Sequence, residues 1–325
     1  MTNYLIFGDN MSVYSELPVD IETFICDDYF LGKFTKNGKM IYPYWRDKLN
    51  KMFIQDSNYS EMVNATAIGT GKTIISVICF IYYLYCLMCL KNPNDFFKAC
   101  EEDEIEILLA SVKKLYALQY YSMLINAIFD SPWFKNHGIF MCKNTKKNSN
   151  DINSKIIYQP FNKIKIEIAY SKDMIYGKHI VGFWFGWLYD ATDTKEFYQE
   201  LKSRVESRTI IDSVKYGRSF VDFEFNCKRY VLDYWKSCYN DIMLNTGPQW
   251  EVRPSNCYDS TRFIIITDGI KGHSKILEKS SNEDRIIPKC YRIIEIPGNL
   301  LYDAKLDIDG FLVNIAGIDI KDETE

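Results

Sequence analysis

Apolar residues along this chain form both short runs and longer stretches with helical spacing. The uncharged stretch 74–90 predicts a helix that is buried on much of its surface, and 115–130 has the spacing of a second helix. The stretch 104–110, which has a fully apolar end, and the strongly apolar and aromatic run 180–189 predict strands. The other predicted elements are paired strands at 156–158 and 164–169, a helix at 197–207, and strands at 218–227, 262–267 and 291–296.

The alternation of strands and helices predicts the fold class. Such an order is typical of an α/β domain in which helices flank a mainly parallel central sheet. The chain has 325 residues, 47% of them hydrophobic, which is enough for a sizeable core in one large domain or two modest ones. A soft domain seam is visible near 240–260. Asp20 and Pro43 fit the cap and the first turn of two further helices.

The charge balance excludes one kind of surface. Lys and Arg number 39 against 43 Asp and Glu, for a net charge of −4. This balance argues against a uniformly basic surface that coats nucleic acid, although it leaves room for a local basic patch. The Lys- and Asn-rich stretch 143–154 is either a solvated loop or a basic loop that faces DNA.

The stretch 74–90 and the cysteines each have two readings. An uncharged stretch of this length is at the short limit for a membrane span, and its tyrosines and Ser76 favour a buried core helix, so we expect no membrane contact. Cys86 and Cys89 have C-x₂-C spacing, but no second pair completes a zinc set among the ten cysteines. The start of the chain lacks a signal-like segment, so we expect free thiols in a reducing cytoplasm.

The segment before the uncharged stretch matches a phosphate-binding loop. It fits G-x-x-x-x-G-K-[ST] at every fixed position except the first, where Thr66 replaces Gly. In such a loop, backbone N–H groups cradle phosphate oxygens, Lys72 reaches the β- and γ-phosphates, and the Thr73 hydroxyl ligates Mg²⁺. The following helix points its positive end at the same anion. The predicted ATP-binding residues of the loop are Thr66, Ala67, Ile68, Gly69, Thr70, Gly71, Lys72 and Thr73.

A nucleotide hydrolase of this type also needs acidic residues at its metal, and Asp190 is the candidate. The apolar run 185–189 places Asp190 at the carboxyl end of a strand, where α/β sites lie, so we predict that it is a metal ligand. The second acid expected beside it is absent, because position 191 is Ala. Asp193 and Glu196 are candidates to replace the missing acid. The alternative is that each is an ordinary acidic residue of the surface. A substitute acid, poor hydrolysis and an engineered Glu→Ala change all remain open.

Arg204 completes the predicted catalytic set with Lys72 and Asp190. Arg204 and Arg208 are four residues apart and so lie on one face of a helix. Arg204 is a candidate arginine finger, which would stabilise transition-state charge in a neighbouring subunit. The alternative is a salt-bridged surface helix in which the arginines pair with Glu200 and Glu206.

Several segments together resemble the large terminase subunit of tailed bacteriophages, the ATPase that packages DNA into proheads. Each motif is short, and their shared order and spacing make the resemblance specific. It extends over nearly the whole chain. The segments are IYPYW at 41–45, NATAIGTGKT at 64–73, SPWF at 131–134, YGKHIVG at 176–182, LKSRVESR at 201–208, WEVRP at 250–254, IIEIP at 293–297 and NIAG at 314–317.

The resemblance implies the fold and the domain organisation. It implies a P-loop NTPase of the RecA/ASCE-like class, with one terminase-type ATPase domain over 1–325 and no nuclease domain. Within it, 1–55 would form an N-terminal lid and adenine-proximal segment, 56–240 the P-loop core, and 241–325 the C-terminal part. Trp45 stands where the family often has Gln, and is a candidate to stack on the base.

The resemblance also implies cofactors and partners. ATP and Mg²⁺ would be bound, and the chain would act on double-stranded DNA with a portal protein and a small terminase subunit. A homo-oligomeric ring on the prohead is the expected assembly, with a monomer in solution as the alternative. The expected location is the host cytoplasm and, transiently, the portal vertex of the prohead.

The chain departs from the family in two places. The family has Asp-Glu where this chain has Asp190-Ala191, so hydrolysis is less well supported than binding. A hydroxyl pair expected to couple hydrolysis to motion is not found at 223–228. Two rival functions follow, another P-loop DNA helicase or translocase, and a hydrolysis-deficient nucleotide-binding assembly protein.

Overall fold

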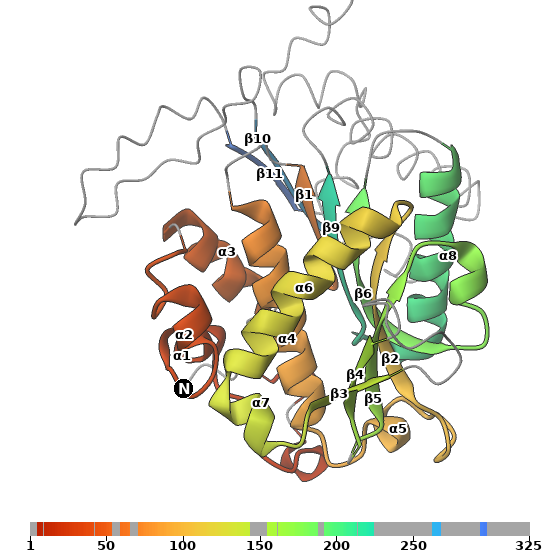
Figure 1. The fold of residues 1–325 in the computed structure, drawn as a ribbon, viewed down its shortest axis with the longest axis horizontal. Coiled ribbons are helices and arrows are strands. Elements are labelled where there is room, and N and C mark those ends of the chain that lie inside the picture. The colour runs from red at the N-terminus through yellow and green to blue at the C-terminus, as the bar shows by residue number, and fades with distance from the viewer. Residues whose placement is uncertain are drawn as a thin grey trace, which may run out of the picture.

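The computed structural model of the chain is built around one large mixed sheet with helices on both faces (Figure 1). Nine strands of the described residues form this sheet, in the order β11-β10-β1-β9-β6-β2-β5-β4-β3. The strands from β10 to β5 in that order run parallel, and β11, β4 and β3 run antiparallel to their neighbours. The structure describes residues 5–8, 10–41, 43–53, 59–65, 71–143, 155–160, 162–187, 192–212, 214–223, 262–267 and 293–297.

The sheet confirms the predicted α/β class with a mainly parallel sheet. Its strands are β1 Glu61–Ala65, β2 Ile105–Ser111, β3 Phe140–Lys143, β4 Lys155–Gln159, β5 Ile164–Ala169, β6 His179–Trp187, β9 Arg218–Phe223, β10 Arg262–Thr267 and β11 Ile293–Pro297. A separate small hairpin pairs β7 Ile210–Ile211 with β8 Val214–Lys215.

The helices divide between the two faces of the sheet (Figure 1). They are α1 Ile21–Cys26, α2 Gly32–Thr35, α3 Pro43–Phe53, α4 Lys72–Met88, α5 Pro93–Phe96, α6 Lys114–Asp130, α7 Pro132–Asn136 and α8 Thr192–Thr209. Side chains of β6 show the division, because successive residues of a strand point to opposite faces. Trp184 stacks on Tyr120 of α6, whereas Phe185 contacts Phe197 of α8.

Helix α4 is the centre of the core. Nearly all of its side chains are buried, as the uncharged sequence predicted. Its tyrosine hydroxyls are hydrogen-bonded: Tyr82 donates to the carbonyl of Val19 at 2.7 Å and Tyr83 to that of Val181 at 3.0 Å. These bonds satisfy polar groups that would otherwise be costly to bury. Cys86 is a free, buried thiol, and burial raises its pKa, which fits an inert core residue.

The packing of Tyr83 of α4 against the sheet depends on a glycine of β6. A Cβ added at Gly182 would lie 2.6 Å from Cε1 of Tyr83 and 2.8 Å from the carbonyl oxygen of Arg218. Only a residue without a side chain fits there. Among the described residues, no helix is long and apolar enough to cross a membrane.

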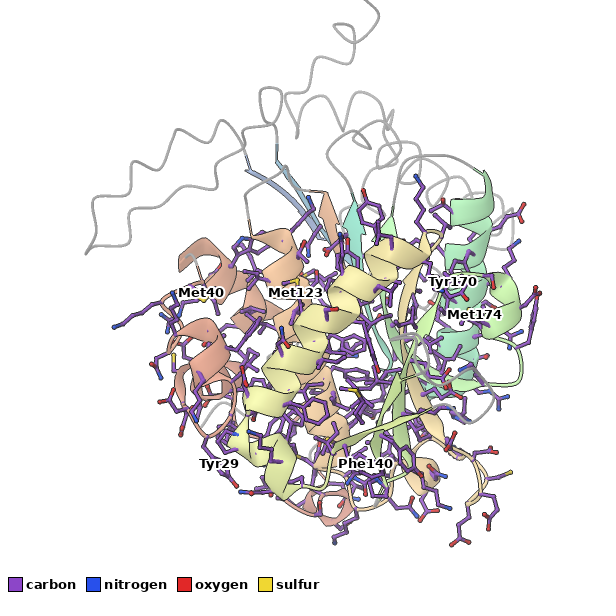
Figure 2. The ribbon with its side chains drawn as sticks, viewed as in Figure 1. Tyr29, Met40, Met123, Phe140, Tyr170 and Met174 are labelled. Atoms are coloured by element: carbon purple, nitrogen blue, oxygen red, sulfur yellow. The ribbon has the colours of Figure 1, made fainter. Side chains whose placement is uncertain are left out.

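Of the N-terminal helices, α1 and α3 pack against α4, and α2 packs against α6. Asp20 caps α1 as predicted, accepting a hydrogen bond from the backbone N–H of Thr23 at 2.8 Å. Pro43 begins α3, also as predicted. Tyr29 lies beside α7 (Figure 2), where its carbonyl accepts a hydrogen bond of 2.9 Å from the backbone N–H of Trp133.

Some predicted boundaries were wrong. Helix α8 begins at Thr192 rather than at 197, because its first turn is polar and carries no apolar periodicity. Helix α6 ends at Asp130 as predicted, but the short helix α7, which begins at Pro132, was not predicted. Strand β3 was not predicted, since its four residues are too few to show alternation. Both the stretch 144–154 and the predicted seam at 240–260 lie outside the described residues.

Candidate nucleotide-binding site

The predicted phosphate-binding loop joins the carboxyl end of a central strand to the start of α4. β1 ends at Ala65, α4 begins at Lys72, and Gly71 is the residue before the helix, with φ 86° and ψ 4°. Side chains disfavour this left-handed conformation, which explains the glycine at the end of the pattern. Thr66, Ala67, Ile68, Gly69 and Thr70 lie outside the described residues, so their phosphate contacts remain predictions.

Lys72 and Thr73 form the first turn of α4. The Lys72 side chain is only 8% exposed, and Thr73 is half-buried. The N–H groups of a first turn have no acceptor within the helix, and the macrodipole is positive at this end. A lysine here adds a further positive charge, which favours an anion at the same place. The residues present therefore fit the phosphates of a nucleotide, with the Thr73 hydroxyl available to Mg²⁺.

Beneath this turn, Asp222 of β9 joins three elements by hydrogen bonds. Its Oδ1 accepts from the Ser76 hydroxyl of α4 at 2.6 Å and from Nδ2 of Asn64 of β1 at 3.1 Å. Its Oδ2 accepts from Nε1 of Trp184 of β6 at 3.0 Å. All four residues are buried. The carboxylate is thus satisfied by donors from β1, α4 and β6 together.

The charge of Asp222 is also close enough to be influenced by Lys72. Burial raises the pKa of the Asp222 carboxyl above its ordinary value, and this effect outweighs the hydrogen bonds from Ser76 and Asn64 and the charge of Lys72, which lower it. Asp222 and Lys72 are both buried, and the charge of Lys72 acts on the Asp222 carboxyl.

Sequence reasoning missed Asp222. The search for a coupling motif was directed at 223–228, of which the structure describes only Phe223. A signal was present, because strand alternation places Asp222 on the same face as apolar Phe220. An acid on the buried face of a strand is rare without a partner, so it was a candidate for a role at the site.

Strand β6 leads toward the candidate metal carboxylate. It ends at Trp187, three residues before Asp190, and its carboxyl end lies at the same edge as the start of α4. β9 lies between β1 and β6 in the sheet. Asp190 and Ala191 themselves are outside the described residues, so the role of Asp190 remains a prediction. Glu196 is exposed and forms an ion pair with Lys172.

Trp45 does not present a free face in this structure. It lies on α3 and is completely buried in the core. A base could stack on this ring only if the residues that cover it moved away. Contact between Trp45 and a nucleotide stays a prediction.

Arg204 is held on the surface of α8. Its guanidinium pairs with Glu200 at 2.9 Å, and its Cζ lies 4.8 Å from the centroid of the Tyr176 ring. Arg204 follows Thr192, the first residue of α8, by 12 positions, which corresponds to about 18 Å along the helix. The ion pair matches the surface-helix alternative, and the arginine-finger role across a subunit boundary stays a prediction.

Comparison with known protein families identifies the family of P-loop domains to which the chain belongs. The family described as "Uncharacterized protein MJ0330, N-terminal P-loop domain" matches residues 8–270. The chain therefore belongs to this family of P-loop domains, whose fold is that of enzymes that hydrolyse nucleoside triphosphates. No curated protein matches the chain.

One solved structure with a similar fold is the large terminase of bacteriophage HK97. The two chains are 10% identical, with a TM-score of 0.40. The match covers 63% of this chain and 37% of the terminase chain, so this chain spans well under half of that protein. At this level the likeness carries no argument about activity.

Proposed function

We propose that this protein binds Mg²⁺·ATP at the first turn of α4 and uses it to move duplex DNA, as a viral packaging ATPase of the terminase type. The observation that supports nucleotide binding best is the placement of Gly71, Lys72 and Thr73. A left-handed glycine, a buried lysine and a hydroxyl follow one another at the amino end of a buried helix. This is the set of groups that a triphosphate requires.

Each residue has a separate task in the proposed reaction. Lys72 would neutralise charge on the β- and γ-phosphates, and Thr73 and Asp190 would hold Mg²⁺. A bound Mg²⁺ supplies charge neutralisation at the phosphates. Arg204 would act on the nucleotide of a neighbouring subunit, which requires release from Glu200. These contributions are positional and electrostatic, as phosphoryl transfer demands.

The DNA-packaging part of the proposal is supported by the order of the sequence segments from 41–45 to 314–317. The partners would be double-stranded DNA, a portal protein and a small terminase subunit, with the chain in a ring at the portal vertex. DNA would be held through phosphates and without sequence readout, which suits a motor. An acidic chain fits transient grip better than tight binding.

A hydrolysis-deficient nucleotide-binding assembly protein is the second candidate. Ala191 favours it, because the position that follows Asp190 would supply the acid that activates water. Under this alternative, ATP would bind and stabilise one conformation without turnover. The two candidates share the same binding site and differ in whether phosphate is released.

Duplex DNA is expected to stimulate phosphate release from ATP several-fold, because a motor couples hydrolysis to its track. Phosphate release is measured with and without duplex DNA of unrelated sequences, at low and at physiological salt. We expect equal stimulation by all sequences and a loss of stimulation as salt rises, since the contacts are to phosphates. Strand separation without a prohead would support a helicase instead, and binding of ATP with no release would support the assembly protein.

A further inference from the structure

The position of Asp222 beneath the phosphate-binding turn gives it a task that the predicted site residues do not cover. Its carboxylate is 2% exposed and lies between β1, which leads into the loop, and β6, which leads toward Asp190. We propose that Asp222 is the positioning residue of the nucleotide site, which sets the rotation of α4 and thereby the direction of Lys72 and Thr73. The inference rests on the proposed function, since positioning matters only if nucleotide binds there.

The bond between Asp222 and Ser76 fixes the rotation of α4. Ser76 follows Lys72 by four residues, so the two side chains lie on one face of α4, one turn apart. The Ser76 hydroxyl donates to Oδ1 of Asp222 at 2.6 Å, and it also accepts from Nδ2 of Asn64 at 3.0 Å. α4 is therefore fixed in rotation one turn below the phosphate-binding lysine. Successive residues of a helix are offset by about 100° around its axis. A rotation of α4 about that axis would therefore change the direction in which the Lys72 side chain points.

The other end of the network is rigid. Trp184 donates to Oδ2 of Asp222 at 3.0 Å, and its ring stacks on Tyr120 with centroids 4.3 Å apart. Tyr120 is itself pressed against β6, since a Cβ added at Gly186 would lie 2.6 Å from its ring. The carboxylate is thus attached to a packed part of the sheet, which makes it a firm reference point for α4.

A charge interaction also links Asp222 to Lys72. The three side chains that donate hydrogen bonds to Asp222, those of Asn64, Ser76 and Trp184, are neutral, and the basic group that acts on it is Lys72. Both side chains are buried, where the attraction between opposite charges is stronger than in water. An attraction between the Asp222 carboxylate and Lys72 would add to the positioning of the first turn of α4.

The test replaces Asp222 with Asn and measures the affinity for Mg²⁺·ATP by calorimetry. Asp222→Asn keeps the shape of the side chain and removes its charge. It also replaces one carboxylate oxygen, which accepts hydrogen bonds, with an NH₂ group, which can only donate them. We expect affinity to fall about tenfold or more, because hydrogen bonds to a charged group are the strong ones. Unchanged affinity, at a temperature well below the unfolding midpoint of the variant, would overturn the proposal.

Tyr198→Phe is the matched control, because it disturbs a different buried carboxylate on the same sheet. The Tyr198 hydroxyl donates to Glu61, which begins β1 at the edge opposite the phosphate-binding turn. Both variants should lower the unfolding midpoint, but only Asp222→Asn should weaken ATP binding. Equal losses of affinity would show a general effect of stability and would contradict the positioning role.

Ser76→Ala tests the positioning role of Asp222 if Asp222→Asn does not fold. It removes the donor to Asp222 and one acceptor of the Asn64 amide, and it leaves the bonds from Asn64 and Trp184 to Asp222 in place. We expect a several-fold loss of affinity. Unchanged affinity would overturn the proposal.

The proposed function is tested separately by wild type and Lys72→Ala. If wild type binds ATP, Lys72→Ala does not, and Asp222→Asn binds like wild type, only the positioning role is wrong. If wild type does not bind ATP, both the proposed function and the positioning role of Asp222 are wrong.

Discussion

Lys72→Ala is expected to weaken Mg²⁺·ATP binding by at least about 100-fold, or ~2.8 kcal/mol. The side chain is nearly buried at the first turn of α4, where the helix N–H groups already favour an anion. Removing the ammonium also leaves the buried charge of Asp222 without the basic group that acts on it. Binding is measured by calorimetry, with the unfolding midpoint determined in parallel.

Lys33→Ala serves as the control for this experiment. Lys33 is an exposed lysine of α2, so its loss changes the net charge by the same amount and touches no part of the proposed site. We expect the control to bind ATP like wild type. Full ATP affinity in folded Lys72→Ala would mean that the phosphates bind elsewhere, and the assignment of the loop would be wrong.

Ala191→Glu is expected to raise the rate of ATP hydrolysis at least about 100-fold, because a positioned general base contributes that much or more. The residue follows Asp190, the candidate metal carboxylate after β6, where P-loop NTPases often carry the acid that orients water. Phosphate release at saturating ATP is the measurement, which separates turnover from binding.

The matched variant is Ala191→Gln, which has a similar size and no basic carboxylate. Its rate should stay near that of wild type, while both variants should bind ATP with similar affinity. If Ala191→Glu gives no turnover even with duplex DNA and portal protein present, position 191 is not the catalytic position. A wild-type rate already typical of a motor would show that another acid serves.

The sequence predicted those parts of the site that depend on neighbours along the chain. Gly71, Lys72 and Thr73 are consecutive, and the uncharged stretch after them, with its tyrosines and Ser76, favoured a buried core helix over a membrane span. The strand leading toward Asp190 could also be predicted, because parallel strands that are buried on both faces are continuous apolar runs in the sequence.

The parts that escaped prediction depend on contacts between distant segments. Asp222 is separated by 146 residues from Ser76 and by 158 from Asn64, and only the sheet order brings them together. Trp45 is recognisable as an aromatic residue near the loop, but its complete burial depends on how α3 packs on the core. The start of α8 was missed for a local reason, since a polar first turn has no apolar period to detect.

The central claim is that a nucleotide's phosphates bind at the amino end of α4. A crystal structure of the protein with Mg²⁺ and a non-hydrolysable ATP analogue tests this most directly. The account predicts phosphate oxygens within hydrogen-bonding distance of the Lys72 ammonium and of backbone N–H groups in the first turn of α4, with Asp222 still bonded to Ser76. A nucleotide bound elsewhere, with no phosphate at Lys72, would contradict it.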